Sequence, residues 1–170
     1  MFRKEEGGKG LKALIIYHTK TGHTLEAARD IARGLEAEGI ECDILEAQLL
    51  EKARISDYDI LVVGSPTYGT RGYRLPAREV QRFLDSLASG ALKGKVCGAF
   101  TVNAGVGGRM LESAMEMKLL KLGGKVIQSG PVVKAGAPLS LWKGPSASEV
   151  DRKKCEEFGR NLAKAAKQGK

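Results

Sequence analysis

Residues 13–24 read ALIIYHTKTGHT, a short apolar run that leads directly into a turn of threonine and glycine. The apolar residues that follow, Leu25, Ala28, Ala32 and Leu35, are spaced by three or four positions, as on one face of a helix. The stretch therefore predicts a buried strand, a tight turn and an amphipathic helix. Backbone N–H groups at the start of such a helix lack intrahelical partners and carry partial positive charge, so the turn is a candidate phosphate site.

The turn also carries side chains that suit a phosphate group. The hydroxyls of Thr19, Thr21 and Thr24 would add hydrogen-bond donors, and Gly22 would let the backbone come close to a ligand. Lys20 could add positive charge beside the phosphate or simply point into solvent.

The rest of the chain repeats the alternation of short apolar runs with helical segments. This pattern predicts an α/β fold in which helices cover both faces of a parallel sheet. The other strands are expected at residues 41–45, 60–64, 96–101 and 125–129, the last with a continuation to Val133. Further helices are expected to begin at Pro76, to contain Leu111–Leu122, and to follow a capping box of Ser146 and Glu149, with Val150, Phe158 and Leu162 facing inward.

Length and composition indicate one domain. The chain has 170 residues, of which 42% are hydrophobic and 28% charged, and we expect a single domain over residues 11–168 after a disordered lead-in at residues 1–10. No apolar run approaches the roughly 20 residues of a membrane span, and the first residues lack the apolar core of a signal peptide, which favours a cytoplasmic location. Cys42, Cys97 and Cys155 form no Cys-x-x-Cys pair, so free thiols are expected and no metal site is indicated.

The formal net charge is +8 at pH 7. Much of it lies near the two ends of the sequence, where charge commonly serves solubility. No nucleic-acid-binding motif accompanies this charge. We therefore expect the positive charge to attract an acidic protein partner or an anionic substrate such as a dinucleotide. The sequence leaves open whether the protein forms a homo-oligomer.

Unusual residues gather where three of the predicted strands end, and in a parallel sheet these ends share one edge, at which ligands bind. The candidate site residues are Thr19, Lys20, Thr21, Gly22, His23 and Thr24 in the first turn, Ser65, Pro66, Thr67, Tyr68 and Gly69 in the second, and Thr101, Val102, Asn103, Ala104, Gly105, Gly107 and Gly108 in the third.

These turns resemble the flavodoxin family, over essentially residues 11–167. The resemblance implies a three-layer sandwich with a five-stranded parallel sheet in the order 2-1-3-4-5, and FMN as a noncovalently bound cofactor. In that family a turn of the same pattern binds the FMN phosphate, which implies this role for Thr19, Thr21, Gly22 and Thr24; His23 stands where the family usually has Asn. By the same resemblance, Tyr68 stacks on the isoalloxazine ring and the Gly69 peptide meets flavin N5.

Two departures favour the branch that contains NAD(P)H:quinone reductases. Residues 101–108 lack the second aromatic ring that short flavodoxins carry there, which would leave one flavin face open to a nicotinamide or a quinone. The segment Ala135–Pro145 is longer than a minimal flavodoxin needs, and in that branch it helps to form the substrate pocket and the subunit interface. Its Trp142 could anchor the segment by packing or serve the pocket or interface.

Three functions remain from the sequence. The first is an FMN-dependent oxidoreductase that passes electrons from NAD(P)H or a reduced partner to a quinone or a protein acceptor; the second is a one-electron carrier without turnover of its own; the third is a flavin-free interaction domain. In the first two the flavin carries the chemistry, so no catalytic side chain is expected, neither His18 nor His23 included. His18 is expected to pack at the strand end or face solvent. Arg71, Tyr73 and Arg74 could bind a dinucleotide phosphate or an acidic partner, or form a solvated loop.

Overall fold

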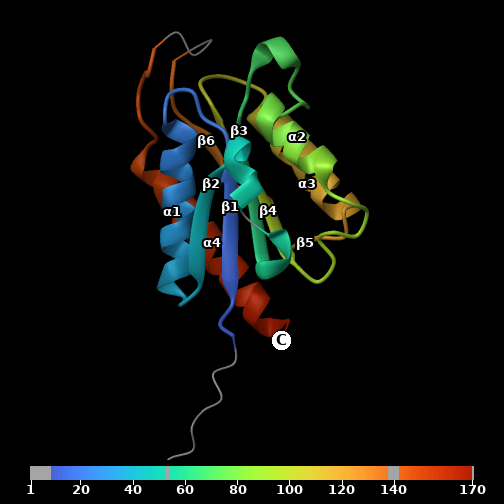
Figure 1. The fold of residues 1–170 in the computed structure, drawn as a ribbon. Coiled ribbons are helices and arrows are strands. Elements are labelled where there is room, and N and C mark those ends of the chain that lie inside the picture. Colours follow the sequence, from blue (N-terminus) through green and yellow to red (C-terminus); the bar gives the residue numbers. More distant parts are fainter. Residues whose placement is uncertain (1–8, 53, 138–141, 170) are drawn as a thin grey trace, which may run out of the picture.

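A computed structural model describes residues 9–52, 54–137 and 142–169 and contains one parallel sheet flanked by helices (Figure 1). The predicted strand order, 2-1-3-4-5, is confirmed. In spatial order the strands are β2 (Glu41–Glu46), β1 (Lys12–Tyr17), β3 (Ile60–Pro66), β4 (Val96–Asn103) and β5 (Lys125–Val126), and β6 (Val132–Lys134) also pairs with β4. The expected lead-in at residues 1–10 lies outside the described residues except for its last two positions.

The fifth strand is interrupted, so the prediction of one continuous strand is wrong. β5 pairs with the start of β4 and β6 with its end, which leaves residues 127–131 between them. At this break the Gly130 N–H donates to the Glu112 carboxylate at 2.8 Å, so a side chain of the neighbouring helix takes a hydrogen bond that a strand would give to the sheet.

Two helices cover each face of the sheet (Figure 1). The helices are α1 (His23–Ala37) and α4 (Glu149–Gln168) on one face and α2 (Arg78–Ser86) and α3 (Gly108–Lys121) on the other. Short 3₁₀ turns connect β2 to β3 at Ala47–Lys52 and Ile55–Asp57, and another follows β3 at Gly69–Arg71.

Two helix starts differ from the prediction. α2 begins at Arg78 and not at Pro76, because Ala77, with φ of −49° and ψ of 146°, is not helical and its N–H donates to Ser65 Oγ at 2.9 Å. α4 is capped by Ser148, whose Oγ accepts from the Asp151 N–H at 3.1 Å, and not by Ser146 with Glu149. The shifted cap turns Val150 outward, where it is 61% exposed, against the expectation that it faces the core.

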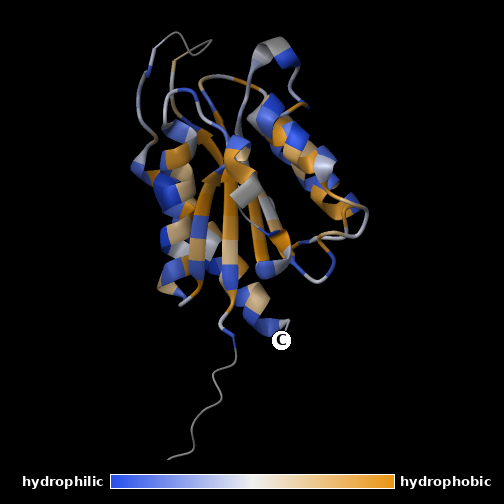
Figure 2. Ribbon diagram, viewed as in Figure 1, coloured by the Kyte–Doolittle hydropathy of each residue, from blue (hydrophilic) through white to orange (hydrophobic). Residues whose placement is uncertain are grey.

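The two faces of the sheet bury separate hydrophobic clusters, because successive strand residues point in opposite directions. In β1, Ala13 and Ile15 pack under α1 and α4, whereas Leu14 and Ile16 pack under α2 and α3. Figure 2 shows the strands as the most hydrophobic part of the ribbon. Among the described residues no helix is both long and apolar enough to cross a membrane.

The helices of one pair lie much closer together than those of the other. α1 and α4 meet at glycines: a Cβ at Gly34 would lie 2.0 Å from the Glu156 carbonyl oxygen, and one at Gly159 would lie 2.1 Å from that of Ile31. Between α2 and α3 there is instead a surface groove of about 350 Å³.

The carboxyl ends of the strands lie together at one edge, and with them the turns that the sequence marks as a candidate site. β1 begins and α4 ends at the opposite edge of the molecule (Figure 1). The fold thus separates the candidate site from both ends of the described chain.

Candidate functional site

The first turn places the start of α1 at the edge of the sheet. Gly22 takes a left-handed conformation, with φ of 93°, and its N–H donates to Thr19 Oγ1 at 2.9 Å. The first helical hydrogen bond runs from the Glu26 N–H to the Gly22 carbonyl, so the N–H groups of residues 23–25 have no partner within the helix. This helix start is positively polarised and can hold an anion.

The second turn contributes an aromatic ring and two hydroxyls that make no hydrogen bond within the described residues. Thr67 Oγ1 and Tyr68 Oη are buried and have no hydrogen-bond partner among the described residues. Burial, with a smaller effect of the Glu79 carboxylate, raises the pKa of Tyr68 to about 12, so the phenol keeps its proton at neutral pH. The Lys20 ammonium lies 4.6 Å from the centre of the Tyr68 ring, within the range of a cation–π contact.

Two buried polar side chains hydrogen-bond to the backbone of the third turn. Thr101 Oγ1 donates to the Gly108 carbonyl at 3.1 Å. In the amide orientation that satisfies both of its ends, Asn103 accepts from the Gly108 N–H at 3.1 Å and donates to the Gly105 carbonyl at 3.2 Å. The loop itself is exposed, up to 71% at Val106.

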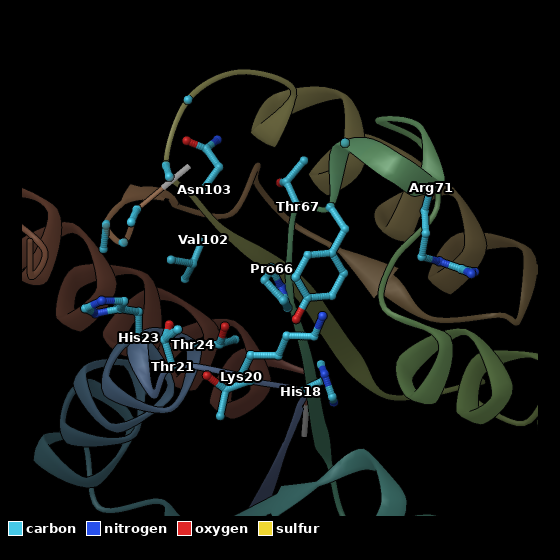
Figure 3. A pocket seen from close by; sticks show the side chains of 18 of the residues that line it. His18, Lys20, Thr21, His23, Thr24, Pro66, Thr67, Arg71, Val102 and Asn103 are labelled. Carbon is cyan, nitrogen blue, oxygen red and sulfur yellow. The ribbon is translucent and has the colours of Figure 1, made fainter. Parts of the chain in front are cut away.

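These three turns surround a cavity of about 780 Å³. Figure 3 shows Thr21, Thr24 and Lys20 on its α1 side, with Pro66, Thr67, Val102 and Asn103 nearby from the ends of β3 and β4. Of the candidate residues, those that line the cavity are Thr19, Lys20, Thr21, His23, Thr24, Pro66, Thr67, Tyr68, Gly69, Val102, Asn103, Ala104 and Gly105.

The other five candidates do not line the cavity. Ser65 is fully buried, accepts from Ala77 N–H and donates to the Pro66 carbonyl at 2.9 Å, so it ties the end of β3 to the start of α2. Thr101 and Gly108 lie under the third turn. Gly22 and Gly107 precede α1 and α3 in left-handed conformations, which lets each turn reverse sharply into its helix.

Several residues that line the cavity were not among the candidates. His18 and Glu79 lie opposite one another, with 3.5 Å between Nδ1 and Oε2, and Arg78 and residues 135–137 complete the wall. Arg71 and Tyr73 also line it, but the Arg71 guanidinium is held by the Pro76 carbonyl at 3.0 Å and by Gln81. The position of His18 directly after β1 was a signal that it lies at the site. Glu79 had no such signal, because it lies in α2, a helix whose start the sequence analysis placed at Pro76.

His23 lines the cavity but its ring is held by other groups. Nε2 lies 2.5 Å from the Lys143 carbonyl oxygen and Nδ1 lies 3.2 Å from Glu26 Oε2, and the side chain is almost fully buried. The ring therefore ties the start of α1 to the segment before α4. Trp142, in that segment, is 63% exposed and does not line the cavity.

The sequence matches the family model described as Flavodoxin over residues 15–151. This chain belongs to the flavodoxin family. The family normally binds FMN and consists of electron carriers. The three turns that surround the cavity in this member lie within the matched residues, as the sequence resemblance implied.

Similar proteins fall into two groups. A flavodoxin of Aquifex aeolicus is 29% identical over 161 residues, which cover 89% of this chain and 85% of that protein. An NAD(P)H dehydrogenase (quinone) of Caulobacter vibrioides is 33% identical, but over only 117 residues, 55% of this chain and 57% of that one. Among solved structures, flavodoxin 2 from Bacillus cereus superimposes with a TM-score of 0.73 at 25% identity, covering 91% of this chain and 99% of that one.

Proposed function

We propose that this protein binds FMN in the cavity and transfers electrons through it. The proposal rests on two buried hydroxyls, Thr67 Oγ1 and Tyr68 Oη, which have no hydrogen-bond partner in the described part of the chain. They lie on one side of a cavity whose other side is the start of α1. A buried hydroxyl without a partner costs about 1–3 kcal/mol, which a polar ligand would recover. A ligand that is anionic at one end and planar and polar at the other fits this arrangement.

Each part of the cavity has a role in holding FMN. The N–H groups at the start of α1 and the hydroxyls of Thr19, Thr21 and Thr24 would bind the phosphate. Lys20 adds positive charge to the cavity from its position over the Tyr68 ring. Tyr68 offers an aromatic face to the ring system. Backbone groups of residues 102–105 would line its polar edge. Bound FMN supplies the capacity to accept and release one or two electrons, while these residues orient it and limit its contact with water.

The binding half of the proposal is tested by adding FMN to the purified protein and following flavin absorbance and fluorescence. We expect a retained, perturbed flavin spectrum, and about tenfold weaker binding for Tyr68→Leu, because the aromatic contact is lost. Tyr58→Leu is the matched control, since Tyr58 precedes β3 and hydrogen-bonds Asp43 away from the cavity. If the protein does not bind FMN, the proposal is wrong and the remaining function is that of a flavin-free interaction domain.

For the reaction we infer that electrons come from NAD(P)H or a reduced partner and pass to a quinone or a protein acceptor. The exposed third turn, without aromatic side chains, supports access to one face of the ring system, and the partial matches to quinone reductases agree with it. The carrier function is favoured by the longer matches to flavodoxins. Steady oxidation of NADH or NADPH in the presence of a quinone would identify an enzyme; reduction of the protein only by another redox protein would identify a carrier.

A further inference from the structure

The groove between α2 and α3 has an apolar lining that is open to solvent. Leu75, Pro76 and Leu84 form its α2 side, and Ala114 and Met117 its α3 side. Met117 is 57% exposed and Leu75 is 44% exposed. Large apolar side chains gathered in an exposed groove indicate an interaction surface more strongly than the same side chains scattered singly.

The groove begins where the cavity ends. Tyr73 lines the cavity, and the next residue, Arg74, lines the groove. Tyr73 also packs directly against the third turn, because a Cβ at Gly107 would lie 2.0 Å from its ring. Whatever occupies the groove therefore lies against the residues that wall the cavity.

The groove is bordered by positive charge that the protein does not neutralise. Arg74 and Lys121 line it, Arg82 is exposed on α2, and none of the three has a carboxylate within ion-pair distance in the described part of the chain. The acidic residue in its lining, Asp85, is already paired with Lys118 at 3.0 Å.

The other acidic side chains nearby point elsewhere. Glu112 and Glu116 accept hydrogen bonds from the Gly130 N–H, and Glu79 faces His18 across the cavity. The groove thus combines an apolar floor with a cationic border.

We propose that this groove is the docking site of an acidic protein that exchanges electrons with the cavity; this inference rests on the proposed function. Its recognition element is an apolar side chain surrounded by carboxylates: the side chain fills the space between Leu75 and Met117, and the carboxylates pair with Arg74 and Lys121. A second copy of this chain is disfavoured, because each copy carries a net charge of +8 and repels the other. Opposite charges would speed the encounter and fix the orientation of an acidic partner.

The test uses rubredoxin with zinc in place of iron, an acidic protein of the required kind that cannot itself take up an electron. It is titrated into the ¹⁵N-labelled, FMN-loaded protein at low ionic strength, and binding is mapped by NMR. We expect shifts centred on the groove residues of α2 and α3, and weaker binding as salt is added. Arg74→Glu with Lys121→Glu should weaken binding by about tenfold or more.

The matched control reverses two charges on the other helical layer. Lys153 and Lys164 are exposed on α4 without a carboxylate partner in the described residues, and Lys153→Glu with Lys164→Glu lowers the net charge by the same amount. This variant should bind within about twofold of the parent protein.

Three results would overturn the proposal: no saturable binding, shifts centred on α1 and α4, or equal weakening in both double variants. Concentration-dependent shifts of the groove without rubredoxin, together with a dimer in sedimentation, would also overturn it, since the occupant would then be a second copy. None of these readouts depends on electron transfer, and the titration can be repeated without FMN. A failure of docking is therefore distinguishable from a failure of flavin binding.

Discussion

The two helices on one face of the sheet are packed closely together, whereas the two on the other face are separated by a groove. α1 and α4 touch backbone to backbone at Gly34 and Gly159, and ion pairs such as Arg33 with Glu156 and Arg152 with Asp30 join the two helices. α2 and α3 leave a groove between them, and its bordering Arg74 and Arg82 have no carboxylate partner among the described residues. The comparison suggests that one layer supplies stability to the fold, whereas the other keeps apolar and charged groups available to a partner.

The largest effect is expected where the closely packed layer is disturbed. Gly34→Ala places a methyl group 2.0 Å from the Glu156 carbonyl oxygen, so α1 and α4 must separate. We expect the free energy of unfolding to fall by at least about 2 kcal/mol, although alanine is the better helix former. Urea unfolding measures this loss.

The corresponding change in the open layer is the control for this prediction. Ala114 lines the groove on α3, so Ala114→Leu adds its side chain to open space. We expect its stability to stay within about 0.5 kcal/mol of the parent protein. If both variants lose the same stability, the contrast between the layers is wrong.

A smaller loss is expected at the joint between the sheet and the open layer. Ser65→Ala leaves the N–H of buried Ala77 without its acceptor, which should cost about 1–3 kcal/mol in urea unfolding. Because the Ser65 hydroxyl is engaged in this joint and does not line the cavity, FMN affinity should remain within about twofold. A large loss of flavin affinity without a loss of stability would contradict the assignment.

The last prediction is a pH dependence of stability in α3. Burial, and then the hydrogen bond and charge of Glu112, raise the pKa of Glu116 from 4.5 to about 8. In this window the folded protein holds a proton that the unfolded chain releases, so stability falls as pH rises from about 4.5 to about 8. Glu116→Gln removes the ionisation and should flatten this slope in urea unfolding between those pH values.

The exposed α4 residue Glu157 provides the control for this slope. Glu157→Gln should leave the slope unchanged. An unaltered slope in Glu116→Gln would show that the buried carboxylate pair does not take up the proton.

Local signals in the sequence were sufficient to locate the strands and the first turn, whereas the order of the strands came from the resemblance to the flavodoxin family. The run before Tyr17 and the glycine at position 22 specify a strand and a reversal into a helix through neighbouring residues alone. The third turn was located, but which of its residues face the cavity depends on packing: Asn103 lines the cavity, whereas Thr101 is fully buried and hydrogen-bonds the Gly108 carbonyl at the start of α3.

The remaining differences also arise from contacts that sequence spacing does not encode. Glu79 meets His18 only when α2 is placed beside β1, and Ser65 sets the start of α2 from a strand twelve positions earlier. Gly130 interrupts the fifth strand by bonding to a carboxylate of α3. Each of these contacts joins residues that are far apart in the sequence, so local spacing does not predict it.

The position of the chain ends has a practical consequence. Because β1 begins and α4 ends at the edge opposite the cavity, a further domain or a surface tether joined at either end leaves the mouth of the cavity clear (Figure 1). The architecture is therefore suited to modular use, in which a fused or immobilised copy keeps its cavity accessible.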